Sequence, residues 1–463
     1  MPKVSQLKFL ALYIAALAAF PLSLLLRSNS GFHQIFWTIF GALPFLAVAL
    51  PIFVTGIVIF EGWIGFVYSL EIALLDILAI AGLMSLGARS IAIPLRYTLP
   101  VIFFVFTAVL SIFQADEPLA ATFGAWQFAR MGLIMIVVAK LCYEPKLALS
   151  LLRGMAIGMT MHLVAVIYQR FGLHLTQTPG LFIHQNTLGM TAHLVLFPCL
   201  ALLLYGYPGL RSQLATAMAT IVVVVFTASR AAVGFSAFGI GLIYLLSALT
   251  GLTGRKMLFA ALGVLGLAVI GPVVIFSFEQ RFEAAPLTED QYDERAAFNR
   301  AATYIIEDHP FGVGSNHYVH VAKNEGYSER AGVAPFEGNR NNIVHNAYLL
   351  AAAETGYLGL LSFAIVLLVP LFVTVRAGWR YRDSAEGHLL LGFGVAMAVI
   401  YVHSFFEWVI FAREVQYLLF MTMGMSYGIV LRLRTSAPVR RNRGSGLGLD
   451  RVMVRPVETP QSR

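Results

Sequence analysis

The chain has 463 residues and a mass of 50.7 kDa; 58% of its residues are hydrophobic and only 12% carry a formal charge. Because a soluble chain carries about 25% charged residues, this composition, with a mean hydropathy of +0.76, excludes a string of soluble domains. Cys142 and Cys199 both fall inside apolar runs, which argues against a disulfide scaffold and against a spaced zinc motif. The composition is that of a polytopic membrane protein.

The net charge of +8 is concentrated near the C-terminus. Residues 432–463 hold eight arginines against only two acidic residues, Asp450 and Glu458. This segment is polar and contains glycine and proline, so we expect it to be a disordered cytoplasmic tail that rests on anionic lipid. We expect no nucleic-acid partner.

Apolar runs long enough to cross a bilayer as helices recur along the whole chain. They lie at 7–26, 35–60, 64–87, 95–114, 124–143, 148–171, 187–206, 212–229, 232–249, 257–276, 355–375, 388–408 and 415–431. The prediction is an all-α polytopic membrane protein with about 12 transmembrane helices and one large, partly helical outer loop. Whether 12 or 13 runs cross stays open, and the segment with Pro44 and Pro51 is the one we expect to be re-entrant.

The distribution of lysine and arginine between the short loops gives the orientation. From the fourth span onward, eleven basic residues fall on one side and three, Arg170, Arg230 and Arg413, on the other. The basic side is cytoplasmic by the positive-inside rule. The chain then divides into an N-terminal transmembrane bundle (1–276), an outer loop (277–345), C-terminal transmembrane helices (346–431) and the basic tail (432–463).

The long outer loop is acidic, with eleven acidic against six basic residues. Loops of this length are usually functional or disordered. Apolar residues at helical spacing over 296–306 predict a helix that opens near Glu294, followed by a turn at 308–314 (DHPFGVG). A second helix is expected to begin near Val344 and to run into the next span.

Ionisable residues at membrane depth are costly, so each is a candidate functional residue. Arg230 interrupts a long apolar stretch at the outer boundary, where it is either a snorkelling helix-end residue or a fork for binding phosphate. Arg295 and Arg300 either extend an anion site or pair with acidic neighbours on a helix face. His345 stands where the polar loop becomes an apolar helix, and it either accepts a proton from a hydroxyl group or caps that helix.

Other polar residues are weaker candidates. His403 and Glu407 are four residues apart and are expected to pair on one helix face. His317 and His320 have a spacing compatible with a metal, but no further ligand supports a metal site. Glu71 and Asp76 of the third apolar run are expected to pair inside the bundle with Arg130 of the fifth run.

No Walker loop, GxGxxG, GxSxG or HExxH sequence occurs, so nucleotide-driven transport and the common hydrolases have no local support. An outward-facing site with arginines and a histidine suits a lipid-linked diphosphate donor. Arginine forks would bind the diphosphate, and a neutral histidine would activate the acceptor hydroxyl.

Four stretches of the sequence resemble the bacterial O-antigen ligase and polymerase superfamily of membrane glycosyltransferases. Residues 180–189 (GLFIHQNTLG) look like its Phe-x-x-x-Asn-x-Leu-Gly segment, and Ser229-Arg230 is similar to its Ser-Arg pair. Residues 294–314 resemble the loop helix and its His-Pro-x-x-Gly-x-Gly turn. Residues 345–349 (HNAYL) look like the signature that closes the large periplasmic loop.

This resemblance implies a transferase of the bacterial inner membrane, with its active site facing the periplasm and with neither a metal nor a cofactor. His345 would be the catalytic base, and Arg230 and Arg295 would bind the donor diphosphate. The further candidates are Arg300, Asn186, His184, Asn346 and Glu407.

The donor implied is a polyprenyl-diphosphate-linked glycan, and the expected partners are membrane lipid and a lipid acceptor. A ligase would use lipid A core as the acceptor, a polymerase would use a lipid-linked glycan, and other relatives use protein hydroxyls. We favour the ligase. A polysaccharide-lipid transporter or flippase is the alternative from another class, although no internal repeat supports it.

Overall fold

The computed structural model describes residues 2–50, 53–87, 91–284 and 289–436, and this part of the chain is almost entirely helical. The first half contains α1 (Pro2–Ser28), α2 (Ser30–Ala42), η1 (Leu43–Leu46), β1 (Val54–Ile59), β2 (Ser69–Ala73), α3 (Leu74–Leu86), α4 (Leu95–Ser111), η3 (Ile112–Gln114), α5 (Pro118–Leu141), α6 (Pro145–Ile167), η4 (Tyr168–Gly172), α7 (Gln185–Tyr205) and α8 (Leu210–Phe226). The second half contains α9 (Arg230–Ala248), α10 (Gly254–Ala284), α11 (Glu289–Asp308), α12 (Tyr318–Asn324), α13 (Tyr327–Arg330), α14 (Glu337–Arg340), α15 (Ala347–Arg380), α16 (Ala385–His403), η5 (Val409–Phe411) and α17 (Arg413–Ser436).

Nine of the described helices are long and apolar enough to cross a membrane. Apolar segments in lipid must satisfy their backbone polar groups internally, which favours helices of this kind. Shorter apolar helices, α3 and most of α8, accompany them. The prediction of an all-α polytopic membrane protein is confirmed.

The predicted spans at 35–60 and 64–87 are wrong. Neither is a single helix, because α2 ends at Ala42 and the chain then passes through η1 into β1, while β2 precedes α3. At 13 residues each, α2 and α3 are about 20 Å long, short of the roughly 30 Å hydrocarbon core. The chain therefore breaks in the region of Pro44, as the proline suggested.

The two strands form an antiparallel hairpin, with Val54 opposite Ala73 and Ile59 opposite Ser69. The tip of this hairpin is fixed to the large loop. The Trp63 indole donates to the carbonyl of Asn316 at 3.2 Å, and the amide of Val67 donates to the Asn316 side chain at 3.0 Å. The hairpin thus joins the N-terminal helices to the loop.

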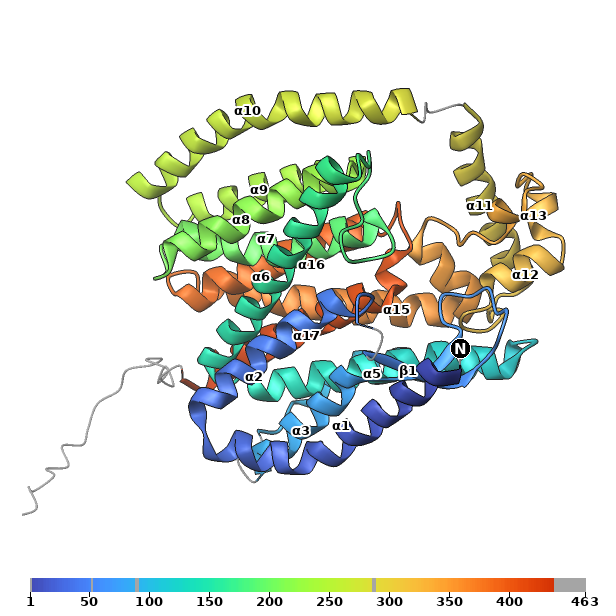
Figure 1. Cartoon of the computed structure of the whole chain (residues 1–463), viewed down its shortest axis with the longest axis horizontal. Helices are drawn as coiled ribbons and strands as arrows, with labels where there is room; N and C mark the ends of the chain where they lie inside the picture. Colours follow the sequence, from blue (N-terminus) through green and yellow to red (C-terminus); the bar gives the residue numbers. More distant parts are fainter. Residues whose placement is uncertain (1, 51–52, 88–90, 285–288, 437–463) are drawn as a thin grey trace, which may run out of the picture.

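α7 is the central helix of the bundle, because nearly all of its apolar window is buried. It packs against α16, α8, α9 and α17. Figure 1 shows the other helices around it, with α10 lying apart along one side; none of the residues in the apolar window of α10 is buried.

A buried ion network ties the early helices to the last one, as the pairing of Glu71, Asp76 and Arg130 predicted. Arg130 Nε lies 2.7 Å from Asp76 Oδ2, and its Nη1 lies 3.4 Å from Glu71 Oε2. Arg413, at the start of α17, donates to the other oxygen of Glu71 at 2.7 Å. Tyr417 completes the network by hydrogen bonding to both Arg130 and Asp76.

The start of α1 lies at the same end of the bundle as the loop helices α11–α13 (Figure 1). Two of the predicted boundaries differ from the structure. α10 continues past 276 to Ala284, and α17 continues past 431 to Ser436. The rest of the predicted basic tail, 437–463, lies outside the described residues.

Candidate active site

The carboxylate of Glu407 brings together four residues that the sequence singled out. Its Oε2 lies 3.0 Å from Nδ1 of His345. Its Oε1 accepts from the side-chain amide of Asn186 at 2.7 Å and from the guanidinium of Arg295 at 3.2 Å. We call Asn186, Arg295, His345 and Glu407 the Glu407 cluster.

The start of α15 holds His345 in this position. Asn346, not His345, caps the helix, because its side chain accepts from the amides of Tyr348 and Leu349. The amide of Ala347 donates to the carbonyl of Ser404 at 2.9 Å, which fixes the start of α15 to the end of α16. His345 is therefore left free of capping and turned toward Glu407.

A second bond fixes the same two segments. The Tyr348 hydroxyl donates to the carbonyl of Tyr401 at 2.8 Å, and its ring lies 4.2 Å from that of Phe405, centroid to centroid. In the HNAYL sequence, Asn346 thus caps α15, Tyr348 bonds to the end of α16, and His345 supplies the imidazole. Only the imidazole faces the Glu407 cluster.

Glu407 is charged at neutral pH in this setting. Its side chain is only 4% exposed, and burial alone would raise its pKa. The hydrogen bond to His345 and the positive charge of Arg295 offset burial, and the pKa of Glu407 lies below its ordinary value. The carboxylate is therefore the acceptor for all three donors.

The predicted pairing of His403 with Glu407 on one helix face is wrong. α16 ends at His403, and Glu407 lies beyond it in the connection to η5, so the two residues do not share a helix. Both ring nitrogens of His403 are buried without a hydrogen-bond partner. Glu407 pairs with His345 instead.

Arg295 and Arg300 both lie on α11, but they make different contacts. α11 packs on α15 through buried residues that include Phe298, Ala301 and Ile305, which confirms the predicted loop helix. Arg295 is 52% exposed and reaches Glu407 from the solvent side. Arg300 donates to the carbonyl of Ala331 at 3.2 and 2.9 Å and so braces the loop.

The turn after α11 docks on α15 where that helix is broken. Gly356 has φ 70° and ψ −174°, which interrupts the helix. The amides of Val313 and Gly314 donate to the carbonyls of Ala353 and Glu354, at 3.0 and 2.9 Å. A Cβ on Gly312 would lie 2.5 Å from the nitrogen of Gly356, so only glycine allows this approach.

Glu354 fixes the segment that follows the turn. Its carboxylate is buried and accepts from the amide of Asn316 at 2.7 Å and from that of Tyr318 at 3.2 Å. The loop and the first turns of α15 are thereby one packed unit. His345 and Arg295 belong to that unit.

The start of α7 supplies Asn186, and His184 caps this helix. Nδ1 of His184 accepts from the amide of Asn186 at 3.2 Å. Asn186 itself is buried, and its amide reaches Glu407 from the side of the bundle.

Arg230 is the first residue of α9, and Ser229 caps that helix. The first turns of α9 lie beside α7, because a Cβ on Gly189 would meet Ala232. They also lie beside the connection that carries Glu407, since the rings of Phe235 and Phe406 are 6.0 Å apart. Arg230 is exposed at the same end of α7 and α9 as the Glu407 cluster.

His317 and His320 do not form a metal site with other ligands. Nδ1 of His317 lies 3.0 Å from the Ser315 carbonyl, and its Nε2 accepts from the amide of Glu117 at 3.2 Å. Within the described ranges there is no group of three or more histidine, cysteine or acidic residues arranged for a metal ion. Both nitrogens of His317 thus serve the packing of the loop.

Sequence reasoning did not identify the partner of His345. Glu407 was a candidate, but for a local pair, and its true contacts are 62, 112 and 221 residues away along the chain. The ring of Phe298 lies 6.2 Å from that of His345, a contact that its place on the apolar face of the loop helix does not indicate. No spacing in the sequence signals such contacts.

Comparison with known proteins finds a family similarity for part of the chain. Residues 215–364 match the family model described as O-antigen ligase. The match contains Arg230, Arg295 and His345, whereas Asn186 and Glu407 lie outside it. No curated protein matches the chain. The match covers residues 215–364 of the 463 and supports the predicted resemblance to the O-antigen ligase and polymerase superfamily, on a fold whose described part holds nine candidate membrane spans.

Proposed function

We propose that the chain is a glycosyltransferase that moves a glycan from a polyprenyl-diphosphate donor to an acceptor hydroxyl on the periplasmic face of the inner membrane. We favour lipid A core as the acceptor, which would make it an O-antigen ligase. The observation that carries the proposal is the 3.0 Å contact between His345 and the buried carboxylate of Glu407, with Arg295 on the same carboxylate.

His345 acts as the base in this proposal. A proton on Nδ1, donated to Glu407, leaves Nε2 with a lone pair, and an ionised carboxylate stabilises this tautomer. Nε2 takes the proton of the acceptor hydroxyl as its oxygen bonds to the anomeric carbon of the donor. The carboxylate then stabilises the imidazolium, and the side chain, 24% exposed, can release the proton to water.

Arg295 and Arg230 act on the leaving group. As the new bond forms, the bond between the anomeric carbon and the diphosphate oxygen breaks, and the diphosphate keeps the electron pair. Arg295 uses Nη2 for Glu407, and within the described part of the chain its other guanidinium nitrogens bond to no protein group. They are thus available for phosphate oxygens, and the exposed Arg230 at the same end of the bundle adds positive charge.

The test is transfer by purified protein with a polyprenyl-diphosphate glycan, with and without lipid A core, with products resolved by size. Product formed only with the core supports a ligase, and longer lipid-linked chains formed without it support a polymerase instead. His345→Ala should lower the rate on the order of a thousandfold. His320→Ala, which removes a loop histidine outside the cluster, is the matched control.

Further variants separate the roles within the cluster. Glu407→Gln keeps the shape but removes the charge, so kcat should fall on the order of a hundredfold, whereas Glu386→Gln, at the far end of α16, should not change it. Arg230→Lys and Arg295→Lys should raise the KM for the donor, because a point charge cannot replace a bidentate fork. Full activity of a well-folded His345→Ala protein, or no product with either acceptor, would contradict the proposal.

A further inference from the structure

A cavity in the described part of the chain lies far from the Glu407 cluster. It has a volume of about 350 Å³ and lies between α2, α6, α7 and the start of α8. Its wall includes Cys199 and Leu202, near the end of α7, whereas Asn186 stands at the start of that helix. Sixteen residues of helix separate Asn186 from Leu202, which is about 24 Å. The cavity therefore opens at the opposite end of the bundle, the end that the basic loops assign to the cytoplasm.

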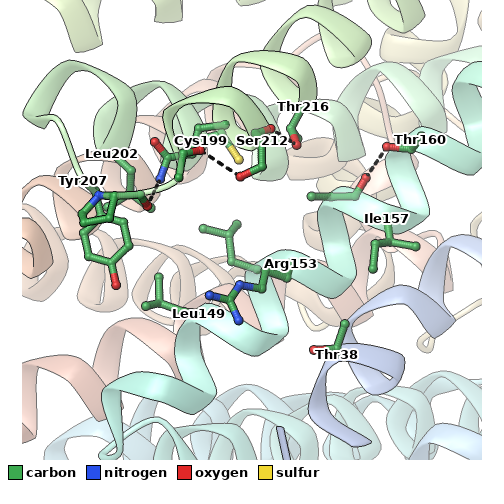
Figure 2. Close-up of a pocket in the computed structure, with 15 residues that line it drawn as sticks. Thr38, Leu149, Arg153, Ile157, Thr160, Cys199, Leu202, Tyr207, Ser212 and Thr216 are labelled. Atoms are coloured by element: carbon green, nitrogen blue, oxygen red, sulfur yellow. Dashed lines mark hydrogen bonds between the residues drawn. The ribbon is translucent and has the colours of Figure 1, made fainter. Parts of the chain in front are cut away.

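Arg153 is the only charged residue that lines this cavity. Figure 2 shows its side chain extending from α6 into the middle of the space, with Ser212 and Thr216 of α8 on one side and Thr38 of α2 on another. Arg153 makes no hydrogen bond or ion pair with any residue that the structure describes. A guanidinium held in a concave site without an acidic partner favours an anionic ligand.

The other polar groups of the wall leave this role to Arg153. The hydroxyls of Thr38, Thr160, Ser212 and Thr216 each donate to a carbonyl of the chain nearby, at 2.8 to 2.9 Å. They can accept hydrogen bonds from a ligand, but their protons are already committed. Arg153 is thus the one charged donor among the residues that line the wall, beside the neutral groups of Tyr207 and Gln213.

Two features surround the cavity with positive potential. α8 begins at its wall with Gly209 as the N-cap and no side chain bonded to the cap, so the positive end of the helix dipole faces this region. The guanidinium of Arg255 lies against Gly206, immediately before the cavity residues Tyr207 and Pro208. No acidic residue lines the wall.

The surface that leads away from the cavity is apolar and exposed. Ile157, Met161 and Val164 follow one face of α6, and they are 45%, 42% and 67% exposed. On α8, Leu214 and Met218 are exposed in the same way, and α6 packs against α8. In a membrane this stripe faces hydrocarbon, so a ligand with a phosphate at the cavity would lay its chain along it.

We propose that this cavity binds the phosphate group of a membrane lipid from the cytoplasmic leaflet, with Arg153 as the charge partner and the α6/α8 stripe as the groove for the lipid chain. The depth of Arg153 agrees with this assignment. It lies eight residues into α6, about 12 Å from the start of the helix, where an uncompensated cation is costly. A glycerophospholipid and a polyprenyl phosphate carry the same group, and the test below separates them.

The first measurement is native mass spectrometry of delipidated protein in detergent, titrated with dioleoyl phosphatidylglycerol or with dioleoyl phosphatidylcholine. The wild-type chain should bind one phosphatidylglycerol more tightly than phosphatidylcholine. Arg153→Gln should lower the affinity for phosphatidylglycerol about tenfold, to the level of the affinity for phosphatidylcholine. Arg376→Gln is the matched control, because Arg376 is also exposed near the basic end of its helix and, within the described ranges, makes no hydrogen bond or ion pair.

A second variant tests the cavity rather than the charge. Thr160→Phe fills the cavity and keeps Arg153, so it should lower the affinity for both lipids. Unchanged thermal unfolding of each variant shows that the fold is intact, which we expect because Arg153 and Thr160 are both exposed.

The second arm replaces the phospholipid with a polyprenyl monophosphate. If Arg153→Gln lowers the affinity for both lipids equally, the phosphate alone is recognised. If it lowers the affinity for the polyprenyl lipid more, the glycan carrier is supported as the natural occupant. An equal effect of Arg153→Gln and Arg376→Gln, or no effect of Arg153→Gln on either lipid, would overturn the proposal. The readout is binding, so it does not depend on glycan transfer at the other end of the bundle.

Discussion

Glu407 is a buried charge whose burial is compensated by three donors. Removing a carboxylate from water costs several kcal/mol, and His345, Arg295 and Asn186 each return a hydrogen bond to it. Oε2 accepts from His345, and Oε1 accepts from Arg295 and Asn186. This division fixes the imidazole and the guanidinium relative to each other through a single rigid group.

His317 is a second loop histidine whose environment determines its protonation. It is fully buried, and burial lowers its pKa from the ordinary value, an effect that the hydrogen bond to Ser315 and the charges of Asp116 and Glu117 only partly offset. The neighbouring His320 lowers the pKa further. The folded loop therefore keeps His317 neutral.

We expect this neutrality to make stability depend on pH. Below the ordinary histidine pKa of about 6.5, the unfolded chain binds a proton at this position while the folded chain does not, so stability falls as the pH falls. Thermal unfolding in detergent at pH 7.5 and 5.5 should show a smaller loss at low pH for His317→Gln than for the wild type. His309→Gln, at a loop histidine that does not act on His317, is the control, and identical pH slopes for the wild type and His317→Gln would contradict the assignment.

The break in α15 is the element that positions the loop. Gly356 adopts a conformation that is almost restricted to glycine, and the amide of Tyr357, just after it, donates to the carbonyl of Pro310 at 3.1 Å. The helix therefore opens at one residue to accept the turn. Without this break, the turn at 308–314 would have no docking position on the helix.

Gly356→Ala should separate the loop from the helix. The new Cβ would lie 2.5 Å from the carbonyl oxygen of Pro310, and the backbone conformation itself is strained for alanine. We expect a loss of about 3 kcal/mol in the free energy of unfolding, measured by thermal or denaturant unfolding, and faster proteolysis at the turn. Gly338→Ala, in the short helix α14 where no atom lies near the new Cβ, is the matched control, and equal stability of the two variants would refute this role.

The long helices, including the one at 7–26, could be predicted from the sequence, and the form of residues 35–87 could not. A run of about 20 apolar residues without breaks, such as 187–206, can satisfy its backbone in lipid only as a helix. The runs at 35–60 and 64–87 are equally apolar, but hydropathy does not distinguish a helix from two strands and a shorter helix. Pro44 and Pro51 are the signal in the run 35–60 that a single helix does not cross there, but they do not indicate which structure replaces it.

At the scale of the whole molecule, the residues of the candidate site were predictable but their arrangement was not. His345 and Arg295 stood out because ionisable groups at a membrane boundary are costly, and both lie in the cluster. Arg300 stood out as a possible anion ligand, and His184 and Asn346 stood out through the family resemblance, but they cap helices or brace the loop. Local sequence cannot separate these roles, because the separation depends on contacts between distant helices.

The ion network around Arg130 should carry much of the stability of the bundle. Arg130 is 3% exposed and joins α5 to α3 and α17. Arg130→Met leaves Asp76 buried without its cation, which should cost about 3–5 kcal/mol. The double variant Asp76→Asn with Arg130→Met should recover part of this loss in unfolding measurements, and a double variant less stable than the single one would contradict the network as drawn.

The position of Glu407 near the end of the chain also sets the moment at which the site can first exist. Asn186, Arg295 and His345 are synthesised earlier, and 62 residues separate His345 from Glu407. At a typical elongation rate, that distance takes roughly 3 to 12 s, and the helix before Glu407 must also be inserted. A nascent chain can therefore carry His345, Arg230 and Arg295 for seconds before the carboxylate that bonds to the imidazole exists, and the Glu407 cluster can form only when α16 is in place.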